Sequence, residues 1–97
     1  MKTARQLERH FKGIANHRRI EILFLIAKNE KISLEGIADI LKCNIKTTSE
    51  HTRKLVQAGL VNKQYKGRMV AHSLSPYGKK FVKFIEIFSN SQEDENN

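Results

Sequence analysis

The chain is poor in cysteine and in long apolar runs, and each shortage excludes a class of protein. With Cys43 as its one cysteine, an internal disulfide framework is excluded, which agrees with a reducing compartment. No apolar run approaches the length that spans a bilayer, and the N-terminal MKTARQLERHF lacks the apolar stretch of a signal peptide. We therefore expect a cytoplasmic protein with no membrane partner. A hydrophobic fraction of 39% over 97 residues is typical of one globular domain.

Acidic residues are also scarce. The chain has 18 Lys and Arg against 10 Asp and Glu, a net charge of +8. Three of the acids, Glu93, Asp94 and Glu95, fall within the last five residues, so the remainder carries 18 bases against 7 acids, or +11. A small domain this basic usually binds a polyanion, and nucleic acid is the first candidate. The alternative is a basic soluble protein without such a partner.

The first thirty residues predict two helices. Between residues 3 and 15 an apolar stripe alternates with charged residues; its members are Ala4, Leu7, Phe11 and Ile14. Asn16 is a good N-cap for a second helix over residues 17–28, which is apolar on nearly every side. We expect this second helix to form the centre of the core.

The segment 32–74 has the pattern of a helix-turn-helix followed by a hairpin. Ser33 caps a short helix that ends at Leu41, and Asn44 caps a longer one that ends at Ala58, followed by Gly59 at the position where helices favour glycine. Residues 60–74 then predict two strands around a Lys66-Gly67-Arg68 tip, and Ile32 is a candidate for a third, short strand. This order predicts a winged helix-turn-helix.

Ser75-Pro76 predicts the N-terminus of a last helix, 76–88. The expected fold is mainly α with a small β-hairpin: five helices plus a wing. We expect residues 1–88 to form one winged helix-turn-helix DNA-binding domain with N- and C-terminal dimerisation helices, and residues 89–97 to be a disordered acidic tail.

The second helix of the helix-turn-helix, 45–58, is expected to read double-stranded DNA. The major groove of DNA admits one helix, which needs polar or cationic side chains near its N-terminus. Seven bases and one acid lie between Lys42 and Arg68, an excess typical of phosphate contacts. The candidate DNA-binding residues are Asn44, Lys46, Thr47, Ser49, His51, Arg53, Lys54, Lys63, Lys66 and Arg68. The wing tip, 66–68, is expected on the phosphate backbone or in a minor groove.

At these residues the chain resembles the ArsR/SmtB-type winged-helix regulators, over residues 15–81. That family opens its second helix with a segment like ALADPTRLRIL, and this chain has Ile14 to Leu23 there. Its recognition segment resembles LSQSTVSRHLKLLREAGLV, which residues 43–61 match without a gap. The resemblance implies a homodimeric transcriptional regulator, most often a repressor, acting on an inverted-repeat operator. Other winged-helix families share the wing and the Ser75-Pro76-x-Gly78 start of the last helix.

Three residues of the reading helix depart from this pattern. Thr48 and Thr52 stand where the family usually has Val and Leu, and their hydroxyls need acceptors such as a carbonyl one turn back. Glu50 replaces what is often a cation. It is expected either to accept from a cytosine amino group or to pair with Arg53 or Lys54, and the pairing is favoured.

No sensor or catalytic site is predicted. The family's metal ligands, a Cys-x-Cys pair or Asp and His in the last helix, are missing, so no metal or cofactor is expected and no small-molecule or metal effector is evident. Cys43 is expected to be a buried structural thiol, His10 and His17 to have surface or capping roles, and His72 to be structural. No nucleophile–base set is visible, so we predict no enzyme.

Apolar residues on the outer helices predict a homodimer. The expected interface consists of Leu7, Phe11, Phe81, Phe84, Ile85 and Phe88. The alternative is that these side chains only close the core of a monomer. Two further functional alternatives stay open: a winged helix that binds protein, and a non-specific architectural DNA binder.

Overall fold

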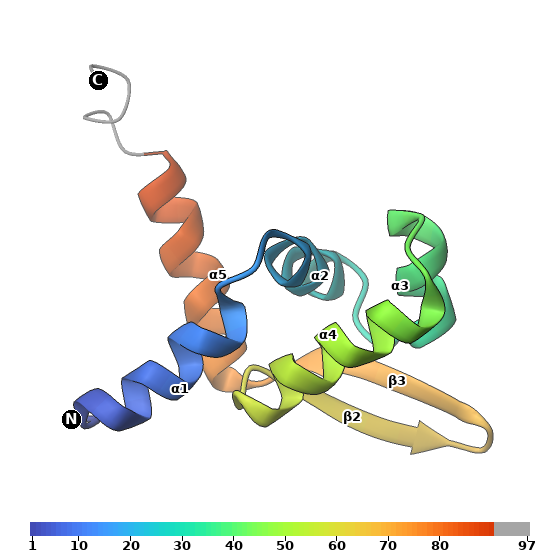
Figure 1. The fold of residues 1–97 in the computed structure, drawn as a ribbon, viewed down its shortest axis with the longest axis horizontal. Helices are drawn as coiled ribbons and strands as arrows, with labels where there is room; N and C mark the ends of the chain where they lie inside the picture. The colour runs from blue at the N-terminus through green and yellow to red at the C-terminus, as the bar shows by residue number, and fades with distance from the viewer. Residues whose placement is uncertain (91–97) are drawn as a thin grey trace.

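The computed structural model describes residues 1–90, which form five helices and a three-stranded antiparallel sheet (Figure 1). In chain order they are α1 (Ala4–Ile14), α2 (His17–Lys28), β1 (Ile32–Ser33), α3 (Leu34–Leu41), α4 (Ile45–Gln57), β2 (Val61–Lys66), β3 (Met69–Leu74) and α5 (Pro76–Ser89). The predicted winged helix-turn-helix is confirmed. Helix α5 ends at Ser89, one residue beyond the predicted end, and residues 91–97 of the predicted tail lie outside the described part of the chain.

Polar side chains fix where each helix begins. Thr3 and Gln6 form a capping box at α1, and the side-chain oxygens of the other N-caps accept hydrogen bonds from backbone N–H groups of the first turn. These other caps are Asn16 for α2, Ser33 for α3, Asn44 for α4 and Ser75 for α5. Because the caps satisfy N–H groups that no helical carbonyl can reach, they fix the residue at which each helix begins.

Helix α2 lies at the centre of the core, as its sequence predicts. Ile22, Leu23 and Ile26 are buried, and the core around them is completed from α3, α4, the sheet and α5. Ile37, Leu55, Leu60 and Val82 are among these surrounding residues. Burial of such aliphatic side chains is the main source of the fold's stability.

The sheet supports the wing. Its strand order is β1-β3-β2, with Ile32 opposite His72, Val61 opposite Leu74 and Lys66 opposite Met69. The short β1 pairs with Ala71 and His72 in the middle of β3, while the β2–β3 hairpin runs alongside α4 and its tip extends beyond the helices (Figure 1). The wing is therefore anchored at its base and free at its tip.

Two tight connections position α4. Lys42 takes the left-handed conformation (φ 53°) at the end of α3, and the Cys43 N–H then donates to the Ala38 carbonyl over 2.9 Å. At the other end Gly59 has φ 77°, which glycine adopts without strain, as its position after the helix predicts. The Ser75 hydroxyl donates to the Gly59 carbonyl over 2.6 Å, so the start of α5 is tied to the end of α4.

Helices α1 and α5 lie on the side of the molecule opposite α3, and the C-terminal part of α5 projects beyond the other helices (Figure 1). Among residues 1–90 no helix is long and apolar enough to cross a membrane.

Candidate nucleic-acid interface

Helix α4 divides into a buried side and a polar side. Thr48, Thr52 and Leu55 are buried against the body of the protein. The outward side carries seven exposed residues: Lys46, Thr47, Ser49, Glu50, Arg53, Lys54 and Gln57. All of the predicted base-reading and phosphate-binding residues within this helix are therefore accessible except His51, which is half-buried.

Asn44 caps α4, which limits the groups of its side chain that are free to contact DNA. Its side-chain oxygen accepts from the backbone N–H groups of Lys46 (2.7 Å) and Thr47 (3.3 Å). The oxygen is thus engaged in capping α4, and the amide NH₂ is the part of the side chain left to donate to a base or phosphate.

The two threonines that depart from the family pattern form hydrogen bonds through their hydroxyl groups within α4 itself. The Thr48 hydroxyl donates to the Asn44 carbonyl (2.9 Å), and the Thr52 hydroxyl donates to the Ser49 carbonyl (3.0 Å). Both acceptors lie within the preceding turn, as expected for threonine in a helix. The methyl groups can then pack in the core without leaving a buried hydroxyl unpaired.

The pairing expected for Glu50 is not formed. The ion pairs between side chains within residues 1–90 are Glu8–Lys12 at 3.4 Å and Arg18–Glu21 at 3.0 Å. Glu50 stays exposed on the outward side of α4 and forms no ion pair with Arg53 or Lys54. The other interpretation, acceptance from a base amino group, remains a prediction.

The wing tip presents its cations to solvent. Lys63, Lys66 and Arg68 are exposed, and Gly67 between the last two has φ 63° with open space around it. Tyr65 and Met69 are also exposed on the hairpin, with 73% and 53% of their surface accessible. Their exposure was not predicted; burial does not alternate along β2 and β3, and position next to the Lys66-Gly67-Arg68 tip was the signal for it.

His51, in α4, has mainly positive neighbours, namely Arg19 and His17 of α2 and Lys54 of its own helix. Burial lowers the pKa of its imidazole below 6.5, the positive charge of Arg19 lowers it further, and the carboxylate of Glu50 opposes both. Burial likewise lowers the pKa of His72, whose Nδ1 lies 3.0 Å from the Ile32 carbonyl oxygen. The structural role predicted for His72 agrees with this burial.

Of the two roles predicted for His10, surface or capping, the surface role is wrong, while its hydrogen bond to the carbonyl of Ala58, the C-cap of α4, agrees with capping. Its side chain is 1% exposed and packs against Tyr77 and Phe81, at ring-centroid distances of 5.3 and 6.2 Å. Its neighbours in sequence, Glu8, Arg9 and Lys12 around Phe11, do not distinguish it from the charged face of α1, so its burial follows only from the contacts with α4 and α5.

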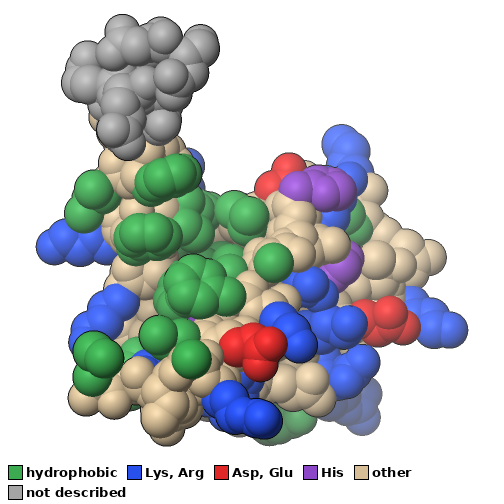
Figure 2. All heavy atoms as spheres, turned by 60° about the vertical axis from the view of Figure 1, so that its left-hand side comes forward, with side chains coloured by type: hydrophobic (Ala, Val, Ile, Leu, Met, Phe, Trp, Pro, Cys, Tyr) green, Lys and Arg blue, Asp and Glu red, His purple; other side chains and the backbone are tan. Residues whose placement is uncertain are grey.

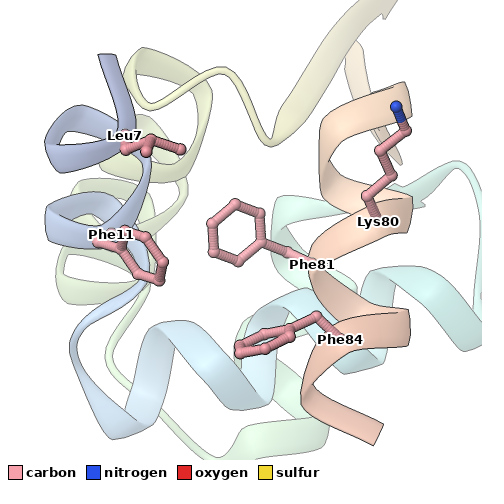
Figure 3. A pocket seen from close by; sticks show the side chains of 5 residues that line it. All are labelled: Leu7, Phe11, Lys80, Phe81 and Phe84. Carbon is pink, nitrogen blue, oxygen red and sulfur yellow. The ribbon is translucent and has the colours of Figure 1, made fainter. Parts of the chain in front are cut away.

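The predicted dimer residues form an exposed apolar face. Leu7, Phe11, Phe84 and Phe88 are 40%, 49%, 54% and 60% exposed, while Phe81 and Ile85 are half-buried. Leu7 and Phe11 point toward Phe81 and Phe84 across a recess of about 240 Å³ (Figure 3). Figure 2 shows hydrophobic side chains gathered on this side of the molecule. Phe81 and Ile85 pack against the core, while the other four side chains leave apolar surface exposed.

Within residues 1–90 no group of three or more His, Cys, Asp or Glu side chains is arranged to hold a metal ion. Cys43 is only partly buried and lies 3.5 Å from the Leu41 carbonyl oxygen, so the expectation of a buried thiol is wrong in degree.

The chain is similar in sequence and in fold to known bacterial regulatory proteins. Residues 16–63, about half of the chain, match the model of the arsR family of bacterial regulatory proteins. Among solved structures, HlyU from Vibrio cholerae is 26% identical, with a TM-score of 0.80 over 90% of this chain and 95% of that one. A homodimeric winged helix-turn-helix DNA-binding domain from Mycobacterium bovis, a possible ArsR-family regulator, is 24% identical, with a TM-score of 0.83 over 97% of this chain and 93% of that one. The transcriptional repressor PagR of Bacillus anthracis is 21% identical, with a TM-score of 0.75 over 84% and 93% of the two chains.

Proposed function

Because the chain belongs to the arsR family of DNA-binding transcriptional regulators, we propose that it represses transcription as a homodimer that binds a specific inverted-repeat operator. The observation that carries this proposal is the outward side of α4. It sits at the end of a helix-turn-helix, offers short polar side chains at its N-terminus, and is flanked by the cationic wing.

The residues divide into two tasks. Lys46, Thr47 and Ser49, with the amide of Asn44 and the ring of His51, contact base edges in the major groove. The six cations that bind phosphates are Lys46, Arg53, Lys54, Lys63, Lys66 and Arg68. The wing tip, 66–68, lies on the backbone or in the adjacent minor groove.

The dimer forms through α1 and α5. An apolar face of this extent on a small monomer calls for a partner, and a second copy supplies a matching apolar surface. The homologous domain from Mycobacterium bovis is a homodimer. A two-fold axis through this face would present two copies of α4 to successive major grooves, about 34 Å apart. A dimer bound to its operator would block access of RNA polymerase and so repress transcription. Because the family is bacterial and bacterial DNA lies in the cytoplasm, we place the protein there.

Selection of bound sequences from a random duplex library tests this function. The expected result is a palindromic motif whose half-sites are about 10 bp apart from centre to centre. The same selection with Lys46→Ala plus Thr47→Ala should yield a different motif or none. If the wild-type protein enriches no sequence yet binds random duplex at low salt, it is an architectural binder. If it binds no duplex at low salt, the helix-turn-helix serves a protein partner.

A further inference from the structure

A second recess opens where α1, α2 and α4 meet. It has a volume of about 300 Å³ and brings together segments far apart in the sequence. Its lining residues are Arg9, Lys12, Gly13, Arg19, Lys54, Gln57 and Ala58. Gly13 permits this close crossing, because a Cβ atom there would collide with the Cβ of Ala58.

The charge of this recess is unbalanced. Four of its lining side chains are cations, those of Arg9, Lys12, Arg19 and Lys54, and no acid among residues 1–90 lines it. Lys12 is paired with Glu8 at 3.4 Å, but both groups are exposed, so the pairing neutralises little. The Arg19 Nε is buried and has no hydrogen-bond partner among residues 1–90, so the terminal nitrogens of this guanidinium are the ones that a ligand could reach. The four convergent cations favour an anion in the recess.

The end of α4 does not explain these cations by itself. Helix C-termini attract positive charge through free carbonyls. Here the carbonyls of Lys54, Leu55 and Val56 already accept from the backbone N–H groups of Ala58, Leu60 and Gly59 at 2.9–3.0 Å. The Ala58 carbonyl is taken by His10.

We propose that the recess between α1, α2 and α4 binds a phosphate group. Guanidinium groups present paired N–H donors that match phosphate oxygens, and Lys54 and Gln57 add donors from the reading helix. A single phosphate fits within a recess of this size. Figure 2 shows Lys and Arg side chains gathered beside the apolar face of the molecule.

Two sources can supply such a phosphate. One is the DNA backbone, since Lys54 and Gln57 also belong to the outward side of α4; this arm rests on the proposed function. The other is a free phosphate-bearing molecule, which would bind where α1, a helix of the proposed dimer interface, crosses the reading helix. The chemistry of recognition is the same in both cases.

Titration of the ¹⁵N-labelled protein with inorganic phosphate against chloride, at constant ionic strength, tests the site without DNA. Saturable amide shifts are expected at residues 9–13, 19 and 54–58. Arg9→Gln plus Lys12→Gln should weaken binding about tenfold or more, because two charge-assisted hydrogen bonds to the phosphate are removed. Both side chains are exposed, so the fold should persist. Arg5→Gln plus Lys79→Gln removes the same charge elsewhere and should leave the affinity unchanged.

The salt dependence of DNA binding distinguishes the two sources. If a backbone phosphate occupies the recess, Arg9→Gln plus Lys12→Gln reduces the slope of log K against log salt by about 0.9 for each phosphate that is no longer bound, and the control pair does not. Saturable phosphate binding with an unchanged slope identifies a free ligand. No saturable phosphate binding together with an unchanged slope overturns the proposal. Failure of the wild-type protein to bind any DNA would contradict the proposed function and leave the phosphate titration as a valid test.

Discussion

The imidazole of His10 in α1 is joined to the carbonyl of Ala58 at the end of the reading helix. The His10 Nδ1 and the Ala58 oxygen are 2.6 Å apart, and because a carbonyl can only accept, Nδ1 carries the proton. The same ring packs against Tyr77 and Phe81 of α5. One buried side chain therefore ties both outer helices to the element proposed to read DNA.

Replacing His10 with Phe should destabilise the fold by about 1–3 kcal/mol, because the aromatic packing is kept while a buried carbonyl loses its donor. Urea unfolding measures the change. His17→Phe, at an exposed position on α2, should cost less than about 0.5 kcal/mol. Equal stability of His10→Phe and the wild type would show that the hydrogen bond contributes nothing.

Local patterns in the sequence were sufficient to predict the order of the elements. The caps at Asn16, Ser33, Asn44 and Ser75 act through residues two or three positions away, so their effect can be recognised without a fold. His10 escaped prediction because its environment is made by Ala58 and by α5, which are distant in sequence.

The candidate site was predictable in part for the same reason. Periodicity identifies the outward side of α4, since buried Thr48, Thr52 and Leu55 recur at helical spacing. The cations of the second recess were not recognisable, because Arg9 and Arg19 meet Lys54 only when three helices cross. In the sequence alone, a charged residue that lines a recess looks the same as one that is solvated on a helix face.

Asn44 allows capping and DNA contact to be separated. Asn44→Ser retains an oxygen that can cap α4 but removes the amide donor, so stability should change little while operator affinity falls. Asn44→Ala removes both and should also lose about 1 kcal/mol of stability. Thermal unfolding and operator titration of both variants provide the comparison. Unchanged affinity in Asn44→Ser would restrict Asn44 to capping.

The histidines predict a loss of stability on mild acidification. Burial lowers the pKa of His51 and His72 in the folded protein, and Arg19 adds to this at His51. The unfolded chain therefore takes up protons at a higher pH than the folded protein, so the free energy of unfolding falls as the pH drops below about 6.5. His51→Gln should make this decline shallower in urea unfolding from pH 8 to pH 5. Parallel curves for the two proteins would show that His51 is not responsible.

Phe84→Asp should convert the proposed dimer into monomers. A carboxylate at the centre of an apolar interface would be desolvated without a partner. Sedimentation at several concentrations measures the association state, and Lys79→Asp, on an exposed position of the same helix, should remain dimeric. A dimer that persists in Phe84→Asp would contradict an interface built on the α1–α5 face.

Lys66→Ala plus Arg68→Ala should weaken DNA binding similarly on all sequences. The two cations flank Gly67 at the exposed tip of the hairpin, where φ is 63° and the space beside the glycine is free of other residues in the range 1–90. Bound phosphates release counterions, so the slope of log K against log salt should become less steep by about 0.9 for each phosphate that the wing no longer binds. Lys28→Ala plus Lys31→Ala serves as the control, since these exposed lysines flank the loop after α2. Base preference depends on α4 and should be preserved in the wing variant. A changed motif with an unchanged slope would mean that the wing reads bases rather than phosphates.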